Sequence, residues 1–196
     1  MPLDVGLVGL PGSGKTSLFT ALTGDSPGPY GKQNVGVAPI PDERLAPLAA
    51  IEGSVKTTPA TIRVFDPPGL SPAVLGELRK ADALIAVLGN FGPGAEPDHD
   101  RETLELELVV ADRDHVEKRL DRVRSQAKSG DPRLRQEVEE LERVLAHLES
   151  GQPLSSYSGE LSAALEPLTT KPLVPIVNGE GGFDLKLEAE LADLAP

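Results

Sequence analysis

One glycine-rich stretch near the start of the chain carries the residue types best suited to chemistry. The stretch Gly9-Leu10-Pro11-Gly12-Ser13-Gly14-Lys15-Thr16 satisfies the pattern G-x-x-x-x-G-K-[ST], which is typical of phosphate-binding loops. Glycines let consecutive backbone N–H groups turn toward one anion, and a helix that begins there adds partial positive charge. We expect Lys15 to reach the β- and γ-phosphates of a nucleotide and the Thr16 hydroxyl to ligate Mg²⁺. The pattern therefore predicts binding of ATP or GTP with Mg²⁺, and the expected contacts are Gly9, Pro11, Gly12, Ser13, Gly14, Lys15, Thr16 and Ser17.

A second motif separates this chain from other phosphate-loop proteins. Asp66-Pro67-Pro68-Gly69 fits D-x-x-G, the switch II pattern of GTPase-like proteins, and it directly follows an apolar run. In that role Asp66 holds Mg²⁺ through water and the Gly69 N–H contacts the γ-phosphate, so Lys15 and Gly69 are the residues expected to assist catalysis. An aspartate that caps a turn at the end of a strand is the structural alternative.

The elements that must position these motifs alternate along the chain. Short apolar or β-branched runs predict buried parallel strands at Leu3–Val8, Val35–Ile40, Thr61–Phe65, Ala83–Leu88 and Leu173–Val177. Ser71-Pro72 is a good start for a helix that continues to about Lys80, and Asp184 could cap the last helix. Strands that alternate with helices predict a doubly wound α/β fold.

Residues 101–150 interrupt this alternation. Apolar residues recur at spacings of three to four before and after the stretch Ser129-Gly130-Asp131-Pro132, which indicates a turn. Two long antiparallel helices are therefore expected, packed as a coiled-coil-like hairpin. The predicted architecture is a G-domain-like, mostly parallel sheet flanked by helices, formed by residues 1–100 and 151–196, with the helical hairpin inserted at 101–150. The Asp98-His99-Asp100 stretch is expected to be a polar loop in which Asp100 caps the helix.

Composition narrows the functional class. The chain has 196 residues, no cysteine and a net charge of −12, so disulfides and thiolate metal sites are excluded. The scattered histidines have no zinc-like spacing, and no apolar stretch reaches membrane-spanning length, which predicts a cytoplasmic protein. The segment Lys118–Arg135 is nevertheless basic, through Lys118, Arg119, Arg122, Arg124, Lys128, Arg133 and Arg135. It indicates either a contact with RNA or an acidic protein, or a solvated helix face with internal ion pairs.

These motifs together resemble the YchF branch of the Obg-like P-loop GTPases, with gaps, from about Leu3 to Phe183. The matching strings are Gly9-Leu10-Pro11, Asn34-Val35-Gly36-Val37, Pro41-Asp42-Glu43-Arg44-Leu45, Val64-Phe65-Asp66, Gly69-Leu70, Glu107-Leu108-Val109-Val110-Ala111-Asp112, Glu117-Lys118-Arg119-Leu120, Ala127-Lys128-Ser129-Gly130-Asp131 and Lys171-Pro172. The resemblance implies a G domain with a helical hairpin between its fourth and fifth strands. It also implies slow nucleotide hydrolysis, often with a preference for ATP over GTP, and in some members association with ribosomes.

The chain departs from that family at several points. The family's switch I threonine has no counterpart, because no threonine lies between Gly24 and Lys56. The hydrophobic Leu70 after D-x-x-G is usual for the family, whereas Ras-like enzymes place a water-orienting glutamine there. The segment from Leu70 to Ala83 is shorter than the family's switch II. The base-reading N-x-x-E is present only as Asn178-Gly179-Glu180, so either Asn178 or Glu180 could meet the base. The family's final strand and C-terminal TGS domain have no counterpart within these residues.

The sequence therefore predicts a nucleotide-binding protein with an intact phosphate loop and weak intrinsic hydrolysis. Nucleotide is expected to control an interaction of the hairpin or the surface next to it, and the resemblance implies a ribosome as the partner. Two alternatives stay open: an interaction module with a degenerate nucleotide site, and a P-loop kinase with a small acceptor, which the D-x-x-G motif disfavours.

Overall fold

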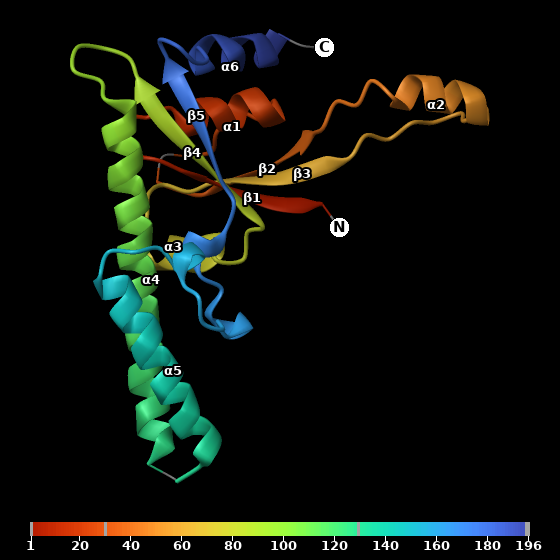
Figure 1. Cartoon of the computed structure of the whole chain (residues 1–196). Coiled ribbons are helices and arrows are strands. Elements are labelled where there is room, and N and C mark those ends of the chain that lie inside the picture. The colour runs from red at the N-terminus through yellow and green to blue at the C-terminus, as the bar shows by residue number, and fades with distance from the viewer. Residues whose placement is uncertain (1, 30, 129, 195–196) are drawn as a thin grey trace.

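The computed structural model describes residues 2–29, 31–128 and 130–194. A single sheet lies at the centre of this part of the chain (Figure 1). Its five strands lie in the order β2-β3-β1-β4-β5. Their bounds are Leu3–Val8 (β1), Asn34–Pro39 (β2), Thr61–Asp66 (β3), Ala83–Asn90 (β4) and Leu173–Gly179 (β5). β1 pairs in parallel with β3 and β4, and β4 with β5, which brings the carboxyl ends of these strands to the same edge. The predicted mostly parallel sheet is confirmed.

The prediction of parallel pairing was wrong for β2. This edge strand runs antiparallel to β3, with Asn34 opposite Asp66 and Pro39 opposite Thr61. Val35 and Val37 are each 53% exposed, so their apolar run did not signal burial. Parallel neighbours need a crossover connection, and the segment between β2 and β3 does not cross the sheet. It extends away from the body as an arm (Figure 1).

The arm carries a helix that the sequence patterns did not predict, α2 (Leu45–Glu52). None of its residues is buried, and Leu48 and Ile51 are 54% and 79% exposed. The helix was missed because its apolar residues do not gather on one face, which is the signal that predicts a surface helix.

Helices cover both faces of the sheet. On one face lie α1 (Lys15–Thr23) and α6 (Leu185–Leu194), whose core residues include Phe19 and Leu185. On the other face lie α3 (Pro72–Leu78) and the first part of α4 (Pro97–Ala127), with Leu78 and Leu104 in the core. Ser71 and Asp184 are at the predicted helix starts, and the Asp184 carboxylate accepts a hydrogen bond from the Leu187 N–H at 3.1 Å.

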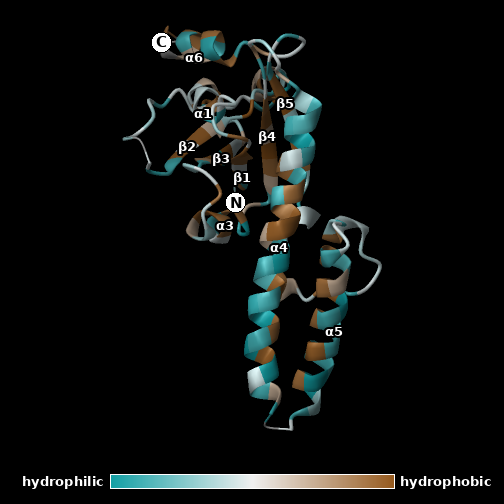
Figure 2. Ribbon diagram, turned by 90° about the vertical axis from the view of Figure 1, so that its left-hand side faces the viewer, coloured by the Kyte–Doolittle hydropathy of each residue, from teal (hydrophilic) through white to brown (hydrophobic). Residues whose placement is uncertain are grey.

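The second half of α4 leaves the sheet and pairs with α5 (Pro132–Glu149), as the predicted hairpin (Figure 2). Leu120 and Leu141 are among the buried residues along the seam between the two helices. Asp131 caps α5 by accepting a hydrogen bond from the Arg133 N–H at 2.9 Å. Ser129, in the predicted turn, lies outside the described residues.

The hairpin differs from its prediction at both ends. α4 begins at Pro97, so Asp98, His99 and Asp100 form its first turn and not a loop. The carboxylates of Asp98 and Asp100 are favourable there because the N-terminus of a helix carries partial positive charge. The chain returns to the sheet through three 3₁₀ turns, η1 (Leu154–Ser156), η2 (Ala163–Leu165) and η3 (Leu168–Thr170). Leu154 is buried, so the segment that leads back to the sheet is partly core. No helix in the described ranges is long and apolar enough to cross a membrane.

Candidate functional site

The glycine-rich loop connects the carboxyl end of β1 to the start of α1, as its motif requires. Gly9 and Gly14 adopt φ values of 152° and 102°. A Cβ atom at Gly9 would collide with the Val87 carbonyl oxygen, and one at Gly14 would collide with the Asn178 side-chain amide. Two of the motif's glycines are therefore required by close backbone packing as well as by the space that an anion needs.

Lys15 lies folded back onto this loop. Its Nζ atom donates hydrogen bonds to the carbonyl oxygens of Gly9 and Leu10 at 2.9 and 3.0 Å. Burial lowers the pKa of Lys15, and the nearby carboxylates of Asp66 and Glu107 oppose that shift. A phosphate group in the loop would offer this ammonium a negatively charged acceptor, which forms a stronger bond than a neutral carbonyl.

The two residues predicted to hold a metal ion are brought together. The Thr16 hydroxyl donates to Oδ2 of Asp66 at 2.9 Å, although 50 positions separate them in the chain. Asp66 is only 3% exposed, and the Asn34 side-chain amide donates to the same oxygen at 2.9 Å. A hydroxyl and a buried carboxylate supply the hard oxygen ligands that Mg²⁺ prefers, so these residues fit the ion. The described residues contain no cluster of three or more His, Asp or Glu side chains that could hold a metal without a nucleotide.

A cleft of about 750 Å³ runs along this loop. The phosphate loop and Ser17 form one wall, and the segment Asp66–Leu70 forms another, with Gly69 among its lining residues. Helix α4 forms a third wall, and its exposed residue Glu107 lines the cleft. In the sequence, Glu107 was recognised only as part of a motif shared with the family. No local pattern shows that α4 would face the phosphate loop.

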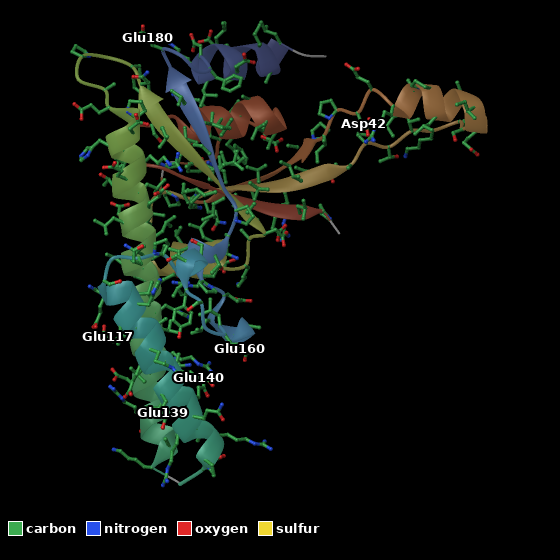
Figure 3. The ribbon with its side chains drawn as sticks, viewed as in Figure 1. Asp42, Glu117, Glu139, Glu140, Glu160 and Glu180 are labelled. Atoms are coloured by element: carbon green, nitrogen blue, oxygen red, sulfur yellow. The ribbon has the colours of Figure 1, made fainter. Side chains whose placement is uncertain are left out.

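The strand β5 ends at the predicted base-reading residues. Both ends of the Asn178 side chain are already engaged: its amide N–H donates to the Ser13 carbonyl at 2.9 Å, and its oxygen accepts from the Leu185 N–H at 3.2 Å. Asn178 therefore braces the phosphate loop. The Glu180 backbone N–H donates to the Asn90 carbonyl at 3.0 Å, and its side chain is exposed at the end of β5 (Figure 3).

A second cavity of about 430 Å³ lies between the phosphate loop and the segment that joins β4 to α4. Its lining includes Ser13, His99 and Phe91, a residue that is 56% exposed. An exposed aromatic ring offers a surface on which a nucleobase can stack. Sequence reasoning did not select Phe91, and the only available signal was an aromatic residue shortly after a strand. The Ser13 hydroxyl is buried and has no hydrogen-bond partner among the described residues.

The basic segment Lys118–Arg135 spans the far end of the hairpin. Two of its arginines form cross-helix ion pairs, Arg119 with Glu137 at 2.6 Å and Arg124 with Glu142 at 2.7 Å. The other basic side chains form no ion pair within the described ranges, and these are Lys118, Arg122, Lys128, Arg133 and Arg135. Part of the segment is thus internally paired, as the structural alternative expected, and part is available for contacts.

A buried ionic network joins the switch II side of the domain to the hairpin. Arg79, just after α3, donates to the Asp112 carboxylate of α4 at 2.6 Å and to the carbonyl oxygens of Ala111 and Glu166. Asp112 also accepts from the backbone N–H groups of Leu168 and Thr169 and from the Thr169 hydroxyl. The partners come from three segments that lie far apart in the chain, so no local sequence pattern predicted this junction.

The fold and the site define a class of protein. A phosphate loop between β1 and α1, together with D-x-x-G at the end of β3 in a mostly parallel sheet, is the arrangement of a P-loop nucleotide-binding domain of the GTPase type. The chain belongs to the family described as "50S ribosome-binding GTPase", whose model matches residues 4–177. The resemblance to the YchF branch is confirmed by the individual relatives.

Two of these relatives carry the name "Ribosome-binding ATPase YchF". The chain is 32% identical over 207 residues to the one from Bacillus subtilis (strain 168), covering 91% of this chain and 57% of that protein. It is 34% identical over 214 residues to the one from Escherichia coli O157:H7, covering 94% and 59%. The structure of the Schizosaccharomyces pombe YchF GTPase aligns with a TM-score of 0.69 and 26% identity, over 90% of this chain and 56% of that one. The chain thus spans less than two thirds of the length of these relatives.

Proposed function

We propose that this chain binds ATP or GTP with Mg²⁺ in the cleft along the phosphate loop, and that it hydrolyses the nucleotide slowly. The observation that carries the proposal is the contact between Thr16 and Asp66 beside Lys15. It unites a phosphate loop with a D-x-x-G aspartate, which is the pairing that nucleoside triphosphatases use. The names of the relatives, which call them ribosome-binding ATPases, support the same reading.

Different residues of the cleft are expected to contact the phosphates and the metal ion. Lys15 would leave the Gly9 and Leu10 carbonyls for the β- and γ-phosphates, and the Gly69 N–H would contact the γ-phosphate. Thr16 and Asp66 would hold Mg²⁺, and the ion would supply positive charge that offsets the charge of the phosphates. Slow turnover follows from the missing switch I threonine and from the short segment between Leu70 and Ala83, because phosphoryl transfer depends mainly on positioning and electrostatics.

Base selection falls to the surroundings of β5. Because both ends of the Asn178 side chain are engaged, Glu180 is the side chain we assign to the base edge, with Phe91 as a stacking surface. A carboxylate accepts hydrogen bonds from the amino groups of adenine or guanine, so this site serves either nucleotide.

We further propose that nucleotide state controls the hairpin. Arg79 directly follows α3, which continues from the D-x-x-G segment, and it is bound to Asp112 of α4. A shift of switch II on nucleotide binding would therefore move a buried charge that the hairpin holds. In this scheme residues 1–100 and 151–196 form the nucleotide domain and residues 101–150 act as the responding hairpin.

The partner we propose for the hairpin is a ribosome, in keeping with the names of the relatives. The basic side chains near the turn, such as Arg122 and Arg133, would contact RNA phosphates or an acidic ribosomal protein. A ribosomal partner would place the protein in the cytoplasm.

Titration by calorimetry with ATP, GTP, ADP and GDP in the presence of Mg²⁺ tests the central proposal. We expect binding in the wild-type chain and at least a tenfold loss of affinity in Lys15→Ala. The matched control is Lys56→Ala, because Lys56 is an exposed lysine on the arm. Equal affinity in the wild type and in Lys15→Ala, or no binding of any nucleotide, would overturn the proposal.

One observation favours the alternative of an interaction module with a degenerate site. Asn34 donates to the same Asp66 oxygen as Thr16, so the metal-holding carboxylate is already satisfied by protein groups. Under this alternative, Asn34→Ala does not change nucleotide affinity because nucleotide does not bind. Under the main proposal, Mg²⁺-dependent binding persists or strengthens in this variant.

A further inference from the structure

The switch II segment contributes few polar side chains to the phosphate side of the cleft. The residues after Asp66 are Pro67, Pro68, Gly69 and Leu70, and none carries a side chain that can accept a proton. Asp66 itself is buried and accepts hydrogen bonds from Thr16 and Asn34. A side chain that takes the proton of an attacking water must therefore come from another element that lines the cleft.

Helix α4 is that element, and it contributes two carboxylates to the cleft lining, Glu107 and Asp114. Asp114 is paired with Arg113 at 2.7 Å and lies two helical turns, about 10 Å, farther toward the hairpin. Glu107 forms no ion pair among the described residues and lies close enough to Lys15 to act on its ammonium group. Glu107 is therefore the carboxylate that faces the phosphate end of the cleft.

The position of Glu107 is set by the core. Its neighbours Leu104 and Leu108 are 0% and 3% exposed and pack against the sheet. A side chain on a packed helix holds its position better than one on a switch loop, which suits a group that must position a reactant.

We propose that Glu107 orients the water that attacks the γ-phosphate and accepts its proton, an inference that rests on the proposed nucleotide hydrolysis. A carboxylate and a phosphate repel each other directly, but a water molecule between them can donate one hydrogen bond to each. The water oxygen forms a bond to the γ-phosphorus as the bond to the β–γ bridging oxygen breaks, and the electron pair stays on the diphosphate. Glu107 takes the water proton and releases it to solvent, and the products are the nucleoside diphosphate and inorganic phosphate.

Single-turnover hydrolysis of ATP and of GTP by the full chain with Mg²⁺, with enzyme in excess, tests this proposal. We expect Glu107→Gln to lower the rate roughly 10²-fold or more, which is typical for loss of a general base, while calorimetry finds the affinity for ATP and GTP unchanged. The matched control is Glu102→Gln. Glu102 is an exposed glutamate on α4 that lines a different cavity, so its rate should equal that of the wild type.

A second measurement does not depend on turnover. ADP and GDP should bind the wild type more tightly when aluminium fluoride is added, because the fluoride complex mimics the transferred phosphoryl group and its attacking water. We expect Glu107→Gln to lose this gain and Glu102→Gln to keep it.

Several outcomes would overturn the inference. A wild-type rate in Glu107→Gln, or an equal loss in Glu102→Gln, would show that Glu107 has no special role. Nucleotide binding without any turnover in the wild type would also overturn it, while the binding part of the proposed function would stand. No binding of nucleotide to the wild type would instead remove the proposed function itself.

Discussion

The two ends of the helical hairpin hold charged residues in opposite ways. At its base, Arg79 and Asp112 are 6% and 1% exposed, and every polar atom named above in their network has a partner. Near its tip, Arg119 and Arg124 pair with Glu137 and Glu142 at similar distances but in contact with water.

The two sets of ion pairs differ in their exposure to solvent and not in their distances. Removing one partner of a buried pair leaves a charge that water cannot reach, which is costly, whereas exposed pairs are screened and contribute little. The base is therefore suited to fix α4 relative to α3 and the sheet, and the tip is suited to present charge to a partner. The following predictions test this contrast, from the largest expected effect on stability to the smallest.

The largest effect is expected at the base. Asp112→Ala leaves the Arg79 guanidinium buried without its counter-charge, and we expect a loss of roughly 3–5 kcal/mol in the free energy of unfolding. Urea denaturation followed by circular dichroism measures it. The control is Asp114→Ala, which breaks an exposed pair with Arg113 and should cost less than about 1 kcal/mol. Equal losses in the two variants would contradict the contrast.

An intermediate effect is expected in the seam of the hairpin. Leu120 is 1% exposed between α4 and α5, so Leu120→Ala removes buried apolar contacts. We expect a loss of about 2–3 kcal/mol, at the lower end for such substitutions, because a seam between two helices can partly close over the cavity. The same denaturation experiment reports it. A loss below about 1 kcal/mol would show that the hairpin seam does not contribute to cooperative unfolding.

The ion pair near the tip should contribute much less than the base. A double-mutant cycle with Arg124→Ala and Glu142→Ala should give a coupling energy of about 0.5 kcal/mol. It should decrease further in 1 M salt, because ions screen exposed charges. A coupling energy of several kcal/mol that is insensitive to salt would place this pair with the buried network.

At the base of the hairpin we also expect stability to depend on pH. This change in the free energy of unfolding should be smaller than the one caused by Asp112→Ala. Burial and then the charge of Arg79 lower the pKa of His115, against the opposing charge of Asp112. Between that lowered pKa and the ordinary value of 6.5, the unfolded chain binds more protons than the folded one, so stability should fall as pH decreases through this window. Denaturation at pH 7.5 and 5.5 should show a smaller decrease for His115→Gln than for the wild type. An identical decrease would exclude His115 as a cause.

The smallest effect on stability is expected for the basic residues of the tip that form no ion pair in the described part of the chain. Replacing Arg122, Lys128, Arg133 and Arg135 with glutamine should leave the urea midpoint nearly unchanged. Co-sedimentation with ribosomes should weaken, and the loss should be greatest at low salt, because each lost phosphate contact reduces the salt dependence. Unchanged co-sedimentation would remove the tip as the contact surface, and Arg119→Gln with Arg124→Gln provides a control that alters internal pairs instead.

Much of this protein was determined by local sequence alone. The phosphate loop, the five strands and the two long helices were all predicted, because each is written in short-range patterns: glycine and lysine spacing, apolar runs, and apolar residues every three to four positions. Gly9 shows how strong such a signal is, since even one Cβ atom there would meet backbone. The roles of the individual site residues stay predictions until nucleotide binding is measured.

Only the tertiary structure decided which of these elements meet. The antiparallel course of β2, the exposed helix α2 and the arrival of Glu107 at the phosphate loop depend on how the chain turns between elements. The bond from Arg79 to Asp112 spans 33 positions, and the one from Asn178 to Ser13 spans 165. Partners so far apart carry no shared local pattern. The physical reason is that an amino acid's neighbours in the chain limit its own conformation, whereas burial and charge pairing are set by whatever the folded core brings beside it.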